Sequence, residues 1–180
     1  MLEQINQAAK MIMEAGKVLI CGNGGSAAES LHLASELLGR FKFERAPIPA
    51  IPLLDPATLT AIGNDYGFEQ VFSRQVEGLG KPGDVLVAIS TSGISPNIVE
   101  AARVAKRKGL SVIAITGGHG GNLRHYADTI ISFHGTTAEI QERHLMAIHQ
   151  ICRIIDSQMA GIQSSAHQMG EHTQQLKGIG

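Results

Sequence analysis

Residues 18–26 read Val-Leu-Ile-Cys-Gly-Asn-Gly-Gly-Ser, and this stretch decides the fold. Its first half is a short apolar run, typical of a buried strand, that stops at Gly22. The glycines after it permit a tight turn and a close backbone approach to a ligand. Ser26 can cap a following helix, whose N-terminal amides and dipole favour an anion. The order indicates a strand end that binds an anion, although a plain Gly-rich turn explains the loop alone almost as well.

Short apolar runs alternate with helix-length segments along the rest of the chain. Further strands are expected at 50–54, 85–89, 112–115 and 129–131. Helices are expected at 26–39, 56–79 with a break near Gly63, 94–108 and 136–159. This alternation predicts an α/β sandwich with a five-stranded parallel sheet, whose ligands bind at the carboxyl ends of the strands. Pro52 cannot donate a ladder hydrogen bond and therefore indicates an edge strand.

Composition places the chain among soluble globular proteins. A length of 180 residues fits one domain, expected over 1–159, and a net charge of −1 argues against a nucleic-acid binder. The two cysteines form no disulfide framework, and no apolar run is long enough for a membrane span. The start of the chain lacks the plan of a signal peptide, so we expect a cytoplasmic protein. Residues 160–180 are polar and are expected to form a mobile tail.

A second loop follows the third expected strand. Residues 90–95 read Ser-Thr-Ser-Gly-Ile-Ser, which places four hydroxyls around one glycine at the start of a helix. No lysine follows as in a nucleotide-binding P-loop, and the first loop is not a dinucleotide fingerprint. Hydroxyls and amides without a lysine suit a phosphomonoester. Two such loops at strand ends make a plain turn a poorer explanation for either.

Four polar side chains form a candidate site for a divalent metal. His32 and Glu36 lie four residues apart and therefore share one face of the first expected helix after the loop. Gln141 and His149 lie two turns apart on the last expected helix and could converge over its middle. The ligand types favour zinc. Spacing alone leaves the alternative open that these residues are surface contacts.

The chain resembles the phosphoheptose isomerases, a family with the SIS (sugar isomerase) fold. The similarity runs through residues 19–26, 31–40, 63–68, 89–93 and 140–149, in unbroken order and with matching spacing. It implies a three-layer sandwich with a flavodoxin-like strand order, and a homotetramer with active sites shared between subunits. It also implies conversion of sedoheptulose 7-phosphate to D-glycero-D-manno-heptose 7-phosphate, the first step towards ADP-heptose for lipopolysaccharide core.

The resemblance also assigns roles to individual residues. Glu36 and His149 would move protons, and one zinc ion per subunit would be held by His32, Glu36, Gln141 and His149. The sugar phosphate would contact Asn23, Gly24, Gly25, Ser26, Asn64, Asp65, Ser90, Thr91, Ser92, Ser95 and Gln141.

Two other functions stay open at this point. SIS domains also occur in sugar-phosphate-binding regulators, and a relative of this family associates with a replication initiator without catalysis. An isomerase acting on another ketose or hexose phosphate is the other alternative. The presence of all four residues of the metal set favours the enzyme. Ala138 and Glu139 stand where the family typically has Asp-Arg, and Ile94 where it has Asn.

Overall fold

The computed structural model describes the backbone of residues 1–177 and the side chains of residues 1–160. Its sheet has five strands: β1 (Val18–Gly22), β2 (Ala50–Pro52), β3 (Val85–Ser90), β4 (Ser111–Gly117) and β5 (Thr129–Phe133). All pairings are parallel, in the order β2-β1-β3-β4-β5. The expected flavodoxin-like order is therefore confirmed. β2 is an edge strand, as Pro52 indicates.

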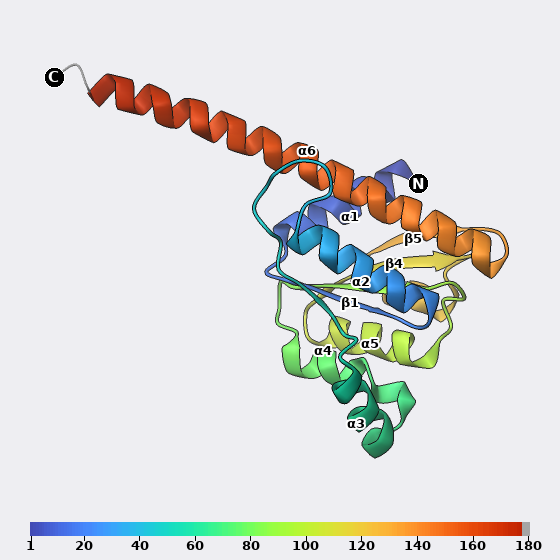
Figure 1. The fold of residues 1–180 in the computed structure, drawn as a ribbon. Coiled ribbons are helices and arrows are strands. Elements are labelled where there is room, and N and C mark those ends of the chain that lie inside the picture. Colours follow the sequence, from blue (N-terminus) through green and yellow to red (C-terminus); the bar gives the residue numbers. More distant parts are fainter. Residues whose placement is uncertain (178–180) are drawn as a thin grey trace.

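Helices cover both faces of the sheet (Figure 1). They are α1 (Leu2–Glu14), α2 (Gly25–Leu38), α3 (Pro56–Tyr66), α4 (Ser73–Leu79), α5 (Pro96–Arg107) and α6 (Thr137–Lys177), with short 3-10 turns η1 (Phe68–Gln70) and η2 (Gly121–His125). One apolar cluster joins α1, α2 and α6 to one face, and a second joins α3, α4 and α5 to the other. The expected three-layer sandwich is confirmed.

The alternating side chains of each strand explain the two clusters. Val18 and Ile20 point into the first cluster, whereas Leu19 and Cys21 point into the second. All five residues of β1 are buried, which is typical of a parallel strand covered on both faces. None of the helices searched among the described residues is long and apolar enough to cross a membrane.

Three features of the helices differ from the sequence expectation. The helical segment expected over 56–79 breaks at Gly67 rather than near Gly63, because Gly67 has φ +85°, a conformation that glycine alone adopts readily. α1 is not among the helices expected from the sequence, although its buried residues Ile5, Ala8, Ala9 and Ile12 follow helical spacing. α6 continues past residue 159 to Lys177.

The expected mobility of the segment 160–180 stays a prediction. The backbone of that segment is helical as far as Lys177, and its last three residues lie outside the described part of the chain.

Candidate active site

The two polar loops lie at the carboxyl ends of β1 and β3, which are neighbours in the sheet. β1 connects to β2 on one side and pairs with β3 on the other, so the strand order reverses here. Such a switch point separates the loops on either side of it and leaves a crevice for a ligand. The fold therefore brings together the two loops that the sequence singles out.

A reciprocal amide pair joins the first loop to the helix after the second. Asn23 Nδ2 donates to Asn97 Oδ1 over 2.9 Å, and Asn97 Nδ2 donates to Asn23 Oδ1 over 2.9 Å. Asn97 is buried at the start of α5. Sequence reasoning missed Asn97, because an Asn beside a Pro at a helix start is ordinary turn chemistry. The pair fixes one loop against the other.

Hydroxyls shape the second loop from within. Gly93 N donates to Ser90 Oγ over 3.2 Å, and Ile94 N donates to Ser92 Oγ over 3.3 Å. Ser90 Oγ in turn donates to Ser95 Oγ over 3.3 Å. Thr91 and Ser92 remain at least partly exposed, so this loop presents hydroxyls at the strand end.

A third Gly-rich loop, residues 117–121, packs directly against the second. Gly93 has φ +66°, and a Cβ built on it would lie 2.3 Å from the carbonyl oxygen of Gly120. A Cβ on Gly117 would lie 2.3 Å from Thr91 O. Only glycine fits such contacts, so these backbones interlock. The run Gly-Gly-His-Gly-Gly at the end of the fourth strand is a sequence signal for this loop, but the loop is not among those singled out from the sequence.

Ser26 is not the helix cap that the sequence suggests. α2 begins at Gly25 with Gly24 at the N-cap position, so Ser26 is already inside the first turn. Ser26 is buried, and its carbonyl accepts from Ser30 Oγ over 2.8 Å. The assignment of Ser26 to the sugar-phosphate site stays a prediction.

Gln141 of α6 packs on the first turn of α2. A Cβ on Gly25 would lie 2.1 Å from Gln141 Nε2, so the amide rests on the bare Cα of this glycine. The structure thus brings a residue of the last helix to the loop after β1. The assignment of Gln141 to the sugar-phosphate site stays a prediction.

His32, Glu36 and His149 meet between α2 and α6. His32 Nε2 lies 2.8 Å from His149 Nε2 and 3.6 Å from Glu36 Oε1. The Glu36 side chain is 19% exposed and that of His32 36%. The ring of Phe41 lies beside His149, with centroids 5.1 Å apart. The half-buried group contains a carboxylate and two imidazoles, which can remove and deliver protons at neighbouring atoms.

The environment of His149 favours a neutral imidazole. Partial burial is the main cause that lowers its pKa below 6.5, and the nearby His32 lowers it further, while Glu36 opposes the shift. A neutral imidazole keeps a lone pair for a metal or a proton. Its N–H can still donate a hydrogen bond to an oxygen of a substrate.

The side chains at this point carry donor types that zinc binds, imidazole nitrogen and carboxylate oxygen. Two nitrogen ligands of a tetrahedral zinc with Zn–N of about 2.0 Å lie about 3.3 Å apart. The His32 and His149 nitrogens are 2.8 Å apart, at hydrogen-bond distance and closer than that value, and His32 Nε2 lies 3.6 Å from Glu36 Oε1. Within the described residues, no three His, Cys, Asp or Glu side chains already form a metal-binding group. Small rotations of these side chains would be needed, together with the amide oxygen of Gln141.

Asn64 and Asp65 lie apart from this group within one chain. Both are exposed at the end of α3, where Asn64 Nδ2 donates to Asp65 Oδ1 over 2.8 Å. Asp65 lines a separate cavity of about 520 Å³, with Tyr66 and Arg74 on its wall. Their assignment to the sugar-phosphate site stays a prediction that needs a second subunit.

Glu139 has a local role at the start of α6. Its Oε2 accepts from Thr136 N over 2.7 Å and from Thr136 Oγ1 over 2.9 Å, which stabilises the first turn. Ile94, within the second loop, is 58% exposed. Neither Glu139 nor Ile94 is part of the His32, Glu36 and His149 group.

Comparison with known proteins identifies the relatives of this chain. Models of the SIS domain match residues 2–117 and 71–167. A phosphoheptose isomerase of Campylobacter concisus is 53% identical over 81% of this chain and 78% of that protein. One from Maridesulfovibrio salexigens is 55% identical over 78% of this chain and 69% of that protein.

The chain belongs to the phosphoheptose isomerase family of SIS-domain proteins.

Solved structures of phosphoheptose isomerases have the same fold. That from Neisseria gonorrhoeae has a TM-score of 0.80 at 46% identity, over 87% of this chain and 86% of the other. That from Francisella tularensis has a TM-score of 0.82 at 44% identity, over 86% of each chain. The Vibrio vulnificus NanR protein, at 17% identity and a TM-score of 0.68, shares the fold alone.

Replacing Gly25 with alanine tests the placement of Gln141. We expect Gly25→Ala to fold, because the flexible end of Gln141 can swing away from the new methyl group. Turnover should fall, since the amide leaves the site. Gln141→Ala and the double variant complete a double-mutant cycle, in which Gly25→Ala should add little once Gln141 is gone. If the effects of Gly25→Ala and Gln141→Ala on kcat/KM add in the double variant, the contact does not act as described.

The pKa of His149 can be measured by imidazole NMR of the metal-free protein. We expect a titration midpoint below 6.5, which should rise when His32→Gln removes the second cause of the shift. Because the pKa of His149 is lower in the folded chain than in the unfolded chain, the unfolded chain binds the proton at higher pH. The free energy of unfolding should therefore fall as pH decreases through about 6.5. A His149 midpoint at or above 6.5 contradicts the description of the site.

Proposed function

We propose that this chain converts sedoheptulose 7-phosphate to D-glycero-D-manno-heptose 7-phosphate. The observation that carries the proposal is the meeting of Glu36 and His32 of α2 with His149 of α6, together with the packing of Gln141 of α6 on the first turn of α2. His32 and Glu36 lie about two and three turns along α2, which begins at the loop after β1, whose amides suit a phosphate. The relatives named phosphoheptose isomerase, at about half identity over most of the chain, support the same substrate class.

The residue types suit an aldose–ketose isomerisation through an enediol. A base removes a proton from C1 of the ketose and returns it to C2, while an acid moves protons between the two oxygens. Glu36 is the carboxylate placed to act as the base. His149, kept neutral by burial, is placed to donate to and accept from the oxygens. The hydroxyls of Ser90, Thr91, Ser92 and Ser95 and the amides near Gly24 would hold the phosphate.

A zinc ion is part of the proposal. His32, Glu36, Gln141 and His149 would hold one ion per subunit. When bound, zinc would polarise the substrate carbonyl and stabilise an enediolate as a Lewis acid. The carboxylate of Glu36 has two oxygens, so one can remain available for the proton while the other faces the ion.

A homotetramer with shared active sites is also proposed. α3 has no buried residue in a single chain, and Tyr66 and Phe68 beside it are 54% and 65% exposed. Figure 1 shows α3 at the end of the molecule furthest from α6. A second subunit against this segment would cover the aromatic rings and bring Asn64 and Asp65 to a neighbouring site. We also propose that the protein acts in the cytoplasm, in the pathway that supplies heptose for lipopolysaccharide core.

A turnover assay on sedoheptulose 7-phosphate, with and without a chelator, tests the function. We expect conversion by the purified protein, loss of activity after chelation and its return with zinc. Metal analysis should find about one zinc per chain. Full activity of metal-free protein would remove zinc from the mechanism. Tight binding of the sugar phosphate without conversion would instead support the regulator.

Glu36→Gln tests the base directly. The change keeps the side-chain volume and removes the carboxylate, so we expect the fold to persist and kcat to fall by at least about 100-fold. Glu14→Gln is the matched control, since the side chain of Glu14 is 67% exposed on α1, on a helix that carries none of the proposed site residues. Retained turnover in Glu36→Gln contradicts the assignment of the base.

A further inference from the structure

Arg45 and Asp156 form a fully buried ion pair beside the proposed active site. Arg45 Nε lies 2.7 Å from Asp156 Oδ1, and both side chains are 0% exposed. Arg45 belongs to the segment between α2 and β2, and Asp156 belongs to α6. Neither residue has a role in the proposed reaction. A buried ion pair adds little stability compared with apolar packing of the same volume. Stability alone therefore does not account for this pair, and its contacts point to another role.

The guanidinium of Arg45 binds the end of α2. Nη2 donates to the carbonyl oxygen of Glu36 over 2.6 Å, and Nη1 donates to that of Leu37 over 2.9 Å. These carbonyls belong to the last turn of α2, which ends at Leu38 and therefore lacks helical donors for them. The positive charge also suits the negative end of the helix dipole. Arg45 thus holds the backbone of Glu36 itself.

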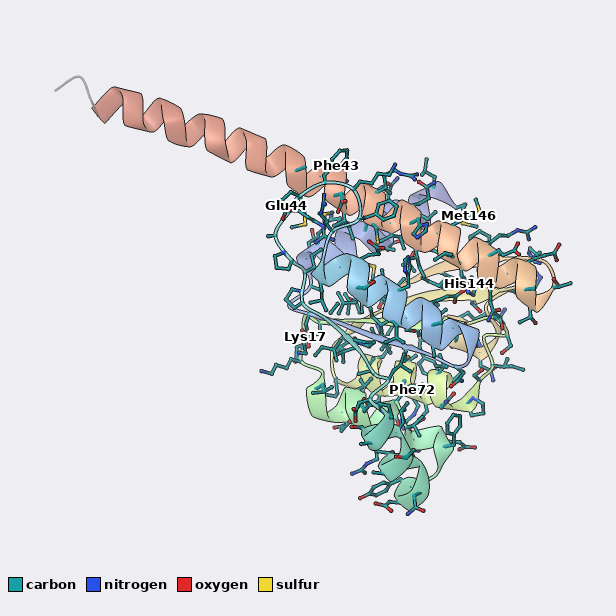
Figure 2. All side chains as sticks on the ribbon, in the orientation of Figure 1. Lys17, Phe43, Glu44, Phe72, His144 and Met146 are labelled. Carbon is teal, nitrogen blue, oxygen red and sulfur yellow. The ribbon has the colours of Figure 1, made fainter. Side chains whose placement is uncertain are left out.

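Asp156 binds the same segment from α6. Its Oδ2 accepts from the backbone amides of Lys42 and Phe43, over 2.5 and 2.9 Å. Figure 2 shows Phe43 and Glu44 in the loop that passes beside α6. Asp156 lies seven residues after His149, almost two full turns, so both lie on nearly the same face of α6. The loop also carries Phe41, whose ring lies against His149.

Hydrogen bonds keep Asp156 ionised. Burial alone would raise its pKa, but the amides of Lys42 and Phe43 and the guanidinium of Arg45 outweigh burial and lower the pKa below its usual value. The pair therefore remains a set of directed, charged contacts at neutral pH.

We propose that Arg45 and Asp156 are positioning residues, which hold the Glu36 end of α2 against the part of α6 that carries His149. This inference rests on the proposed function. The two groups that move protons lie on different helices, and a displacement of about 1 Å between such groups can lower a rate about 100-fold. Apolar packing can slide, whereas the fork of Arg45 fixes the Glu36 carbonyl in distance and direction.

The variants Arg45→Lys and Asp156→Asn test the proposal. Arg45→Lys keeps a positive charge but loses the fork, and Asp156→Asn keeps the shape but loses the charge. For folded protein, assayed well below its melting temperature, we expect kcat to fall about 100-fold with KM unchanged, because the phosphate loops are not touched. Zinc affinity, measured by competition with a chromophoric chelator, should weaken about 10- to 100-fold.

Lys17→Met is the matched control. Lys17 forms an ion pair with Asp84, with side chains 20% and 5% exposed. It precedes β1 at the amino ends of the strands, opposite the loops (Figure 2). This variant should lower the melting temperature and leave kcat and zinc affinity as in the parent.

The outcomes separate the two proposals. If Arg45→Lys and Asp156→Asn lower only the melting temperature, as Lys17→Met does, the pair is structural and the inference is wrong. A parent chain that fails to turn over sedoheptulose 7-phosphate contradicts the proposed function instead. In that case the ratio of zinc affinities between variant and parent still tests the positioning role. Should Asp156→Asn not fold, Arg45→Lys carries the test.

Discussion

The contact between α2 and α6 is the interaction on which the site depends. α2 carries His32 and Glu36, and α6 carries Gln141 and His149, more than a hundred residues further along the chain. Both helices pack on the same face of the sheet through one apolar cluster, to which α2 contributes Leu33 and Leu37 and α6 contributes Ile148, Ile151 and Ile155. Burial of each of these side chains stabilises the folded chain by about 1.5–3 kcal/mol. His32, Glu36 and His149 come together only because this packing aligns the facing sides of α2 and α6.

The sheet explains why the two polar loops, the proposed phosphate site, are separate from His32, Glu36 and His149. The loops after β1 and β3 are neighbours because the strands are parallel and adjacent, and the reversal of strand order leaves room between them. At this end the backbones of Gly93 and Gly120 pack so closely that a Cβ on Gly93 would lie 2.3 Å from Gly120 O. The imidazoles and the carboxylate instead stand on helix surfaces, from the second turn of α2 onwards. A sugar phosphate anchored at the loops would extend its carbon chain along α2 towards Glu36.

Local sequence signals predict most of this architecture, because strands buried on both faces and loops rich in glycine or serine have distinctive compositions. The failures have tertiary causes. Gly63 is tolerated inside α3, since glycine in a helix costs only about 1 kcal/mol, while the break falls at Gly67, whose positive φ depends on how the chain turns towards α4. Spacing brings His32 to Glu36, but no local pattern reveals that Asn97 faces Asn23 or that Arg45 reaches Asp156. Those pairs are visible only once distant elements have packed.

Among the described side chains, several buried polar groups lie where α2 meets α6 and the loop after α2. Glu29 and His144 form a second buried pair across the same helices, with His144 Nδ1 3.4 Å from Glu29 Oε2. Buried polar contacts stabilise a fold less than apolar ones of equal volume, but they distinguish one register from another, because a slipped register leaves a buried charge without a partner. Apolar packing therefore supplies the attraction between α2 and α6, and polar contacts select its alignment. A site divided between two helices needs both, since the attraction alone would not hold Glu36 and His149 at one separation.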